Sequence, residues 1–279
     1  MNGRRERLPA RTLRYVVLCA GAVLMVGPFL YLLSTSFKPQ AFVLEIPPRF
    51  LPTHPTAAAY GQAWNSANFS TYFLNSTIVA VASTVISLAL SAMMAFALAR
   101  FEFAGKRIVF GALLLALMIP GMMLLLPQFL LARRLGLIDS LTGLVVFYVA
   151  GSLALNTFLL RGFMEDQPHD LDEAMLVDGA NALVRFTRLA LPLARPALAA
   201  AAIFTFIGSW EEFVLALTLN SSPANWTLPV GIAQFQGQHQ TSWNLVFAAS
   251  TIALIPVIVV FLAFQRQFVR GLTAGAVKG

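Results

Sequence analysis

The sequence predicts an all-α membrane protein with six transmembrane helices and both chain termini in the cytoplasm. Hydrophobic residues make up 58% of the 279 residues and charged residues only 11%, whereas soluble globular proteins carry roughly 25% charged residues. Six runs are apolar and long enough to cross a bilayer, and positive charges gather between them. This composition excludes a soluble enzyme and a disordered chain. The net charge of +7 forms no basic stripe, so we expect membrane lipid, and no nucleic acid, as a partner.

Six spans follow from the rule that about 20 apolar residues cross a bilayer as a helix. They are predicted at residues 15–37, 72–98, 108–131, 141–160, 197–219 and 243–264. The first run is too long for the apolar core of a signal peptide, and no small-x-small cleavage site follows it, so we expect a retained span. With both ends on one side, 15 of the 19 lysines and arginines lie on that side, which marks it as cytoplasmic. We therefore expect a single transmembrane domain over residues 1–279.

The segment at residues 161–196, between the fourth and fifth spans, is the longest predicted cytoplasmic loop and the most charged stretch. Pro168 is tolerated in the first turn of a helix, and the carboxylates that follow it favour the positive end of that helix. Gly179 can adopt a positive φ and end this helix, and a second helix fits residues 182–191 before Pro192. Such a short pair buries little apolar surface alone. It needs a partner surface, unless it is an amphipathic loop lying on lipid headgroups.

Two predicted outer loops differ in composition. The loop at residues 38–70 contains five prolines and is expected to be extended. The loop at residues 220–241 is rich in Gln, Asn, Ser and Gly and carries no formal charge unless His239 is protonated. It suits contact with an uncharged polar ligand or a protein, or it is a plain connector.

The order of residues in the 161–196 segment resembles the EAA motif of ABC importer permeases. In that motif Glu-Ala-Ala is followed after three residues by Gly and, nine residues later, by Ile-x-Leu-Pro. Here Glu173-Ala174-Met175 is followed by Gly179 and by Leu189-x-Leu191-Pro192, so one Ala and the Ile are replaced by other apolar residues. Further stretches are similar to the carbohydrate-uptake branch of this family, and in particular to the smaller maltose-type permease subunit. Among them are GPFLYLLSTSFKP, AFALARFEFAGKR, SWEEF and the final GLTAGAVKG.

The resemblance implies a permease subunit of an ATP-driven, binding-protein-dependent importer in the inner membrane of a prokaryote. Such a subunit carries a sugar or oligosaccharide by alternating access and is not itself an enzyme. ATP and Mg²⁺ are expected in a separate ATPase, and this chain has no phosphate-binding loop, cofactor, metal site or catalytic residue. The implied partners are a second permease subunit in a heterodimer, a dimer of ATP-binding cassette ATPase subunits and an extracytoplasmic solute-binding protein.

The resemblance also implies that the helix containing Glu173 is a coupling helix, which docks on the ATPase and is turned sharply at Gly179. The implied ATPase-coupling residues are Glu173, Ala174, Met175, Asp178, Gly179, Leu189, Leu191 and Pro192.

Polar residues within the predicted spans are candidates for a substrate pathway. Glu211 and Glu212 lie in the fifth predicted span, where a carboxylate costs about 2.5–3.5 kcal/mol on insertion scales and usually faces a cavity or a partner. Adjacent helical residues point about 100° apart, so we expect only one of the two to face the pathway. The family pattern usually has Asn where Glu211 stands, and structural or gating roles stay open beside substrate binding. The candidate pathway residues are Asn75, Tyr148, Asn156, Trp210, Glu211 and Glu212.

Three alternatives are considered beside sugar import. The same machinery could import a phosphorylated polyol such as a glycerol phosphate. An ion-coupled secondary transporter would need a relay within the spans, which only the Glu211–Glu212 pair could supply. An intramembrane protease would use Ser152 as its nucleophile, but it needs a base at membrane depth. The three histidines, His54, His169 and His239, all fall in predicted loops.

Overall fold

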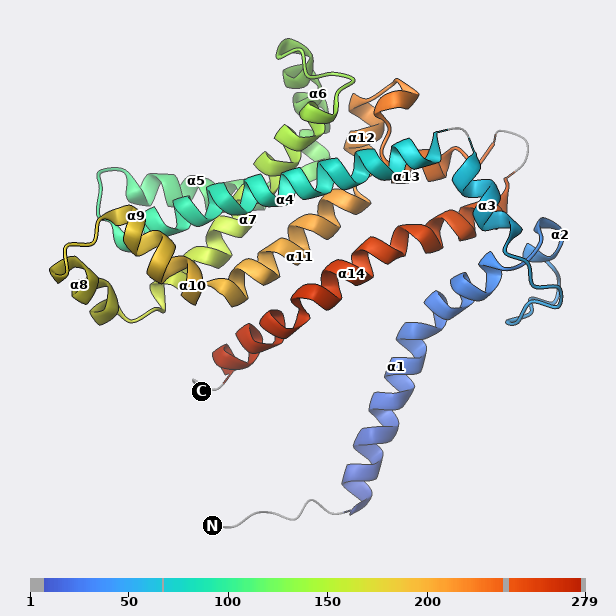
Figure 1. The fold of residues 1–279 in the computed structure, drawn as a ribbon, viewed down its shortest axis with the longest axis horizontal. Helices are drawn as coiled ribbons and strands as arrows, with labels where there is room; N and C mark the ends of the chain where they lie inside the picture. Colours follow the sequence, from blue (N-terminus) through green and yellow to red (C-terminus); the bar gives the residue numbers. More distant parts are fainter. Residues whose placement is uncertain (1–7, 67, 238–240, 277–279) are drawn as a thin grey trace. The chain divides into compact units, whose positions relative to one another are not determined.

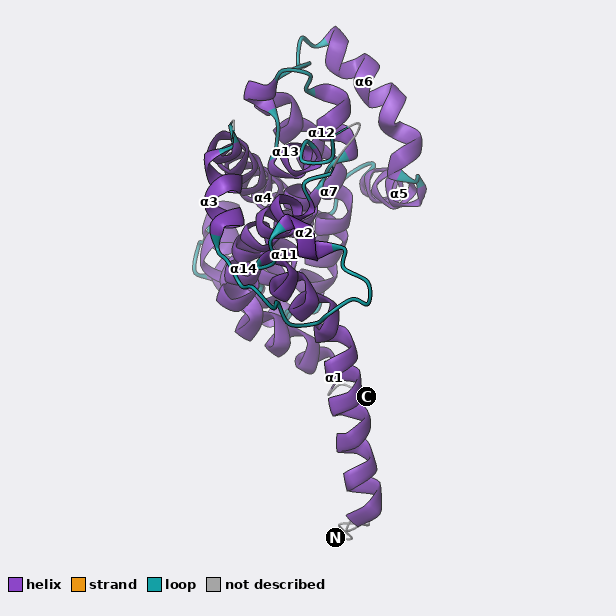
Figure 2. Cartoon of the chain, turned by 90° about the vertical axis from the view of Figure 1, so that its right-hand side faces the viewer, coloured by secondary structure: helices purple, strands orange, loops and turns teal. Residues whose placement is uncertain are grey.

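The fold is described by a computed structural model over residues 8–66, 68–237 and 241–276, with side chains over residues 12–66, 68–237 and 241–267. Within these residues every regular element is a helix, and the β-type pairing is limited to an isolated bridge between Gln236 and Thr241 (Figure 2). This confirms the predicted all-helical class. The chain divides into two compact units, residues 1–67 with 232–254 and residues 68–231 with 255–279.

The first unit begins with three helices: α1 (Leu8–Ser36), α2 (Gln40–Val43) and α3 (Ala58–Asn65). The most apolar stretch of α1 has no residue buried within the chain. Lys38 follows α1 and is only 1% exposed; its ammonium donates to the carbonyl of Arg49 at 2.6 Å and lies 3.8 Å from the Glu45 carboxylate. The prediction that residues 38–70 are extended throughout is wrong, because the stretches between and after the prolines are long enough for α2 and α3 to form.

The second unit is organised around three long helices that pack against one another, α4 (Phe69–Arg100), α7 (Leu141–Glu165) and α11 (Arg195–Glu211) (Figure 1). Small residues let helices approach closely in a membrane. The buried small residues of α4 are Ser76, Ala80, Ser83, Thr84, Ser87, Ser91, Ala92 and Ala95. Asn156 of α7 is 1% exposed, and its side-chain amide donates to Ser87 of α4 at 2.9 Å and to Thr205 of α11 at 2.8 Å. This amide therefore joins all three helices.

Two apolar clusters pack at opposite ends of α4. The cluster near the start of α4 includes Val79, Leu144, Phe147, Leu215 and Leu219. The cluster near its end includes Ala95, Phe96, Leu160, Met164 and Ala190. At the start of α7, a Cβ atom on Gly143 would lie 2.2 Å from the carbonyl oxygen of Leu137, so any side chain there would force the backbone apart.

Four helices in the described part of the chain are long and apolar enough to cross a membrane, and up to six spans result if each of two bent helix pairs counts as one. The four helices are Thr12–Ser36, Phe69–Arg100, Leu141–Glu165 and Trp243–Gln267. They overlap the predicted first, second, fourth and sixth spans. The last of them belongs to α14 (Trp243–Ala276), which continues beyond the predicted end of the sixth span.

The third predicted span, residues 108–131, is not a single straight helix. α5 (Lys106–Met118) ends before Pro120, and η1 (Gly121–Leu124) and α6 (Leu125–Arg134) continue at an angle of 99° to it. Pro120 has no N–H to donate, and it disfavours a helical conformation at Ile119, whose ψ is 117°. The prediction of a continuous span is corrected for this reason.

The fifth predicted span, residues 197–219, is also interrupted. α11 ends at Glu211, Glu212 is extended with ψ of 125°, and a separate helix, α12 (Val214–Leu219), follows. The premise that Glu211 and Glu212 sit within one continuous helix is therefore wrong. A further bend of 76° lies just before α11, between Leu193 and Arg195. Pro192 lies inside the short α10 (Leu191–Leu193), so the prediction that it ends the preceding helix is wrong.

Candidate functional site

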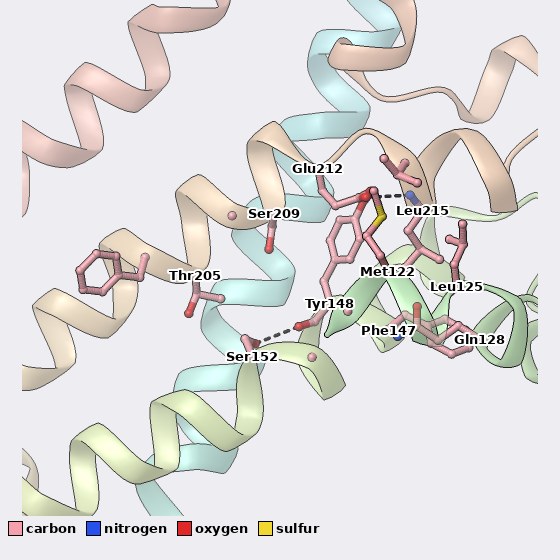
Figure 3. Close-up of a pocket in the computed structure, with 15 residues that line it drawn as sticks. Met122, Leu125, Gln128, Phe147, Tyr148, Ser152, Thr205, Ser209, Glu212 and Leu215 are labelled. Atoms are coloured by element: carbon pink, nitrogen blue, oxygen red, sulfur yellow. Dashed lines mark hydrogen bonds between the residues drawn. The ribbon is translucent and has the colours of Figure 1, made fainter. Parts of the chain in front are cut away.

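A cavity of about 410 Å³ lies in the second unit, beside the break between α11 and α12 (Figure 3). Its walls come from α7, α11, α12 and the bent η1–α6 segment, and Met122, Leu125 and Phe147 supply apolar surface. The polar side chains that line it are Gln128, Tyr148, Ser152, Thr205, Ser209 and Glu212. All but Glu212 are uncharged, so the cavity offers hydroxyl and amide groups next to apolar and aromatic surface.

Three hydrogen bonds hold Glu212 at the helix break. The Tyr148 hydroxyl donates to Oε2 at 2.6 Å, and the backbone N–H groups of Leu215 and Ala216 donate to Oε1 and Oε2 at 2.7 and 2.9 Å. Both N–H groups belong to the first turn of α12, where a helix lacks internal acceptors, so the carboxylate caps this helix. Figure 3 shows Tyr148 reaching from α7 towards Glu212. This carboxylate therefore links α7 to α12.

Tyr148 and Glu212 line the cavity, and the other four predicted pathway residues do not. Asn75 is instead held by the chain beyond α12, because its side-chain amide donates to the carbonyls of Ala224 and Trp226, both at 2.9 Å. This contact joins α4 to the connection after α12.

The remaining predicted pathway residues have separate surroundings. Asn156 is occupied by the three-helix contact described above. The Trp210 side chain is 3% exposed, and its ring lies 5.6 Å from the Phe73 ring and 5.7 Å from the Phe206 ring, measured between centroids. Glu211 is exposed at the end of α11. The break therefore separates the two carboxylates by environment: one is fixed beside the cavity and the other lies on the surface.

Sequence reasoning missed Gln128, Thr205 and Ser209 as cavity-lining residues and considered Ser152 only as a nucleophile. The sequence carried a signal for Ser152, Thr205 and Ser209, namely polar residues spaced four apart, which share one face of a helix. Ser152 is four residues from Tyr148, and Ser209 is four residues from Thr205. Gln128 had no such signal, since its position depends on the bend before η1.

Ser152 has no base beside it among the described residues. Its hydroxyl lies 2.7 Å from the Ser87 hydroxyl and donates to the carbonyl of Tyr148 at 2.9 Å. His169 lies in α8, where its ring nitrogen is 3.2 Å from Arg100, and His239 falls outside the described residues. This arrangement gives no support to the protease alternative.

The 161–196 segment contains the predicted helix, glycine corner and second helix. Its elements are α8 (His169–Val177), α9 (Ala182–Arg185), the π-helical η2 (Phe186–Ala190) and α10. Gly179 has φ of +79°, and the N–H groups of Gly179 and Ala180 donate to carbonyls of the last turn of α8 at 3.0 and 2.9 Å. Asn181 then caps α9, since its side-chain oxygen accepts from the N–H of Val184 at 2.9 Å.

The motif residues in this segment divide by exposure. Exposed residues are Glu173, Ala174, Asp178 and Gly179, and half-buried residues are Met175, Leu189, Leu191 and Pro192. Three apolar side chains of α8 are also exposed: Leu171, Leu176 and, at 88%, Val177. α8 therefore presents an apolar surface with a carboxylate beside it, and no described element of its unit covers this surface.

The connection after α12 is anchored rather than free. It contains η3 (Pro223–Asn225) and leads into α13 (Leu228–Ala233). The Asp139 carboxylate accepts from the hydroxyl and the backbone N–H of Ser222, the latter at 3.0 Å, and the Asn225 side chain donates to the Asp139 carbonyl at 2.6 Å. These hydrogen bonds stabilise the charged carboxylate and so lower the pKa of Asp139 below its ordinary value. The largest contribution comes from the Ser222 hydroxyl and the next from the Ser222 N–H. Residues 220–231 are therefore an anchored, partly helical segment, and its contact with a ligand or a protein stays a prediction.

Comparison with known proteins gives this geometry its context. Residues 87–274 match the family described as binding-protein-dependent transport system inner membrane component. The diacetylchitobiose uptake system permease protein NgcG of Streptomyces coelicolor is 36% identical over 266 residues, which cover 95% of this chain and 88% of that protein. The trehalose transport system permease protein SugB of Mycobacterium tuberculosis is 39% identical over 254 residues, which cover 90% and 92%.

A solved structure agrees with the sequence comparison. It is a chain of a bacterial ABC transporter involved in the import of the acidic polysaccharide alginate, with a TM-score of 0.80, 26% identity and coverage of 96% of this chain and 99% of that one. These similarities extend over nearly the whole chain and confirm the family resemblance drawn from the EAA-like motif. The chain belongs to the family of binding-protein-dependent transport system inner membrane components, and it is a multi-pass permease subunit of an ABC importer.

Proposed function

We propose that this permease carries a sugar or oligosaccharide across the cytoplasmic membrane by alternating access. In this proposal residues 1–279 form one permease domain with six spans, two of them bent, and both termini face the cytoplasm. Support comes from relatives named for diacetylchitobiose and trehalose uptake and from the 15 of 19 basic residues on the proposed cytoplasmic side.

The observation that carries the sugar proposal is the chemistry of the cavity beside the helix break. Its hydroxyl and amide groups next to Tyr148 and Phe147 suit a polar, uncharged ring compound. No lysine or arginine is among its lining residues, so a phosphorylated polyol is not favoured. The ion-coupled alternative is not favoured either, because Glu212 already accepts three hydrogen bonds. Tyr148 and Glu212 are thus the predicted pathway residues that we retain for substrate contact or gating.

Coupling to ATP hydrolysis is assigned to the 161–196 segment. α8 would dock on one subunit of an ATP-binding cassette dimer, which holds ATP and Mg²⁺, through its exposed apolar side chains and Glu173. Ala174 would allow close approach, Met175 beside it packs half-buried, Asp178 and Gly179 would form the corner, and Leu189, Leu191 and Pro192 would lead the motion into α11. A second permease would complete the pathway, and a solute-binding protein would deliver the sugar to the opposite side. In this way a movement of the docked α8 would shift the permease between its inward-facing and outward-facing states.

Gly179 provides the test of this coupling. No atom of this chain lies within 4 Å of a Cβ atom built there, so within the chain a substitution acts through the positive φ alone. A left-handed conformation costs a non-glycine residue roughly 1–2 kcal/mol, and a β-branched residue tolerates it least, whereas Asn tolerates it well. We expect Gly179→Val to abolish sugar uptake in proteoliposomes containing the complete importer, while Gly179→Asn retains it. Normal uptake by an assembled Gly179→Val importer would contradict the assignment.

The partners and the substrate can be identified together. Affinity purification of this chain in mild detergent should recover a second permease, an ATPase with a phosphate-binding loop and a solute-binding protein, and the last can be screened against sugars. Recovery of the chain alone or as a homo-oligomer would contradict the proposed assembly.

A further inference from the structure

A buried ion pair joins the two arms of the 161–196 segment. Asp172, in the first turn of α8, and Arg185, the last residue of α9, are 7% and 6% exposed, and a guanidinium nitrogen lies 2.7 Å from a carboxylate oxygen. Two other ion pairs, Lys106–Glu102 and Arg161–Glu165, each join residues only four apart in the sequence, and their side chains are more exposed. The Asp172–Arg185 pair is different because it connects separate helices and is shielded from water.

This pair is the buried attachment of α8 to the rest of the unit, beside an exposed contact of 3.2 Å between the His169 ring of α8 and the Arg100 guanidinium of α4. Of the nine residues of α8, Asp172 alone is buried and Met175 is half-buried. Arg185 in turn lies over the ring of Phe101, with the guanidinium carbon 5.7 Å from the ring centroid. Phe101 follows directly after α4, so a chain of contacts runs from α8 through the pair to the end of α4.

The segment following Arg185 is held to the same end of α4. The Phe96 ring of α4 lies 5.3 Å from the Phe186 ring of η2, and the Gln167 side chain donates to the Ala190 carbonyl at 3.3 Å. Arg100 in turn donates to the Gln167 carbonyl at 3.3 Å. Arg185 is therefore fixed to the body of the unit, and it holds the buried side of α8 through Asp172.

We propose that the Asp172–Arg185 pair is the joint that sets the orientation of α8 and transmits its displacement to η2, α10 and α11. Asp172 and Arg185 are positioning residues for coupling, and their role rests on the proposed function of α8 as the coupling helix. A buried ion pair is directional, and loss of one partner leaves the other charge unpaired in a poorly solvated site. Without the pair, α8 can still meet the ATPase through its exposed face but no longer moves together with α11.

The joint can be observed without relying on any transport function. The only cysteine, Cys19, is exposed in α1 and can be changed to Ser. Spin labels at Val177 of α8 and Thr187 of η2, both exposed, then report the distance between the two arms by pulsed electron paramagnetic resonance on the full chain. We expect a narrow distribution for the parent, a broad one for Asp172→Asn and Arg185→Gln, and a narrow one for the control Glu102→Gln, which removes a surface pair of the same 2.7 Å length. Unchanged distributions in Asp172→Asn and Arg185→Gln would overturn the proposal.

The transmission of motion from α8 to α11 is tested by the amount of sugar transported per ATP hydrolysed, measured on the complete importer with its binding protein. Coupling between distant sites is typically worth about 5–150-fold, so we expect this ratio to fall at least tenfold in Arg185→Gln while the ATPase still co-purifies. Arg185→Lys keeps the positive charge beside Asp172, so we expect it to fold where the neutral variants assemble poorly and to recover most of the ratio. A parent-like ratio in Arg185→Gln, or no recovery in Arg185→Lys, refutes transmission through the pair. A parent importer without ATP-dependent uptake would instead contradict the proposed function and leave the distance measurement as an independent result.

Discussion

Removing the Glu212 carboxylate tests whether the break between α11 and α12 is built around it. In Glu212→Ala, α12 loses its cap, which costs about 0.5–2 kcal/mol. The Tyr148 hydroxyl, on a side chain only 8% exposed, also loses its acceptor, and a buried donor without a partner costs about 1–3 kcal/mol. The expected loss in the free energy of unfolding is therefore about 1.5–5 kcal/mol.

The assay is equilibrium unfolding of the full chain in mixed detergent micelles, followed by tryptophan fluorescence. The matched control is Glu211→Ala, because Glu211 carries the same charge one residue earlier but is exposed. We expect a change within about 0.5 kcal/mol for this surface substitution.

A double-mutant cycle separates the two contributions to the loss. Tyr148→Phe in the Glu212→Ala background removes the unpaired hydroxyl, so the combined loss should be smaller than the sum of the single losses by about 1–3 kcal/mol. Additive effects, or equal losses for Glu212→Ala and Glu211→Ala, would refute the idea that Glu212 fixes the break.

Three further substitutions test other contacts. Gly143→Ala should destabilise the chain by about 1–3 kcal/mol, because its Cβ would lie 2.2 Å from a carbonyl oxygen. The control Gly162→Ala, in the same helix, meets open space and should be neutral or stabilising. Equal effects of the two substitutions in thermal unfolding would contradict this reasoning. Asn156→Ala should cost about 0.6–2 kcal/mol, the range for a polar contact between membrane helices, and no loss would exclude the three-helix contact as a stabilising one. The folded-state pKa of Asp139 is lowered, so its contribution to stability is present above the unfolded pKa and is lost as the pH falls through the folded pKa. Ser222→Ala should therefore weaken the acid-side decrease in melting temperature, and an unchanged pH profile would rule out this cause.

Much of the architecture could be predicted because its signals are local. A long apolar run satisfies its backbone within one helix and buries its side chains in lipid, so hydropathy locates α1, α4, α7 and α14 without any knowledge of their neighbours. The corner at Gly179 could likewise be predicted, since a positive φ is a property of one residue and its adjacent turn.

The bends had weaker signals. Pro120 could have indicated the first bend, because the effect of proline on the preceding residue is local, but the apolar run around it favoured a continuous span. Nothing within SWEEF indicates that Glu212 leaves the helix. Its conformation depends on the hydroxyl of Tyr148, which lies 64 residues earlier and reaches it from another helix.

By itself, the sequence determined that the chain is helical, that it is a membrane protein and that it carries one charged segment with a glycine corner. Only the tertiary structure decided which polar residues share a cavity, which carboxylate caps a helix and that Asp172 meets Arg185 away from water. The physical reason is that hydropathy and turn propensity are properties of neighbouring residues. A cavity or a buried ion pair requires side chains from different helices, and their meeting depends on bends and packing angles that no single segment encodes.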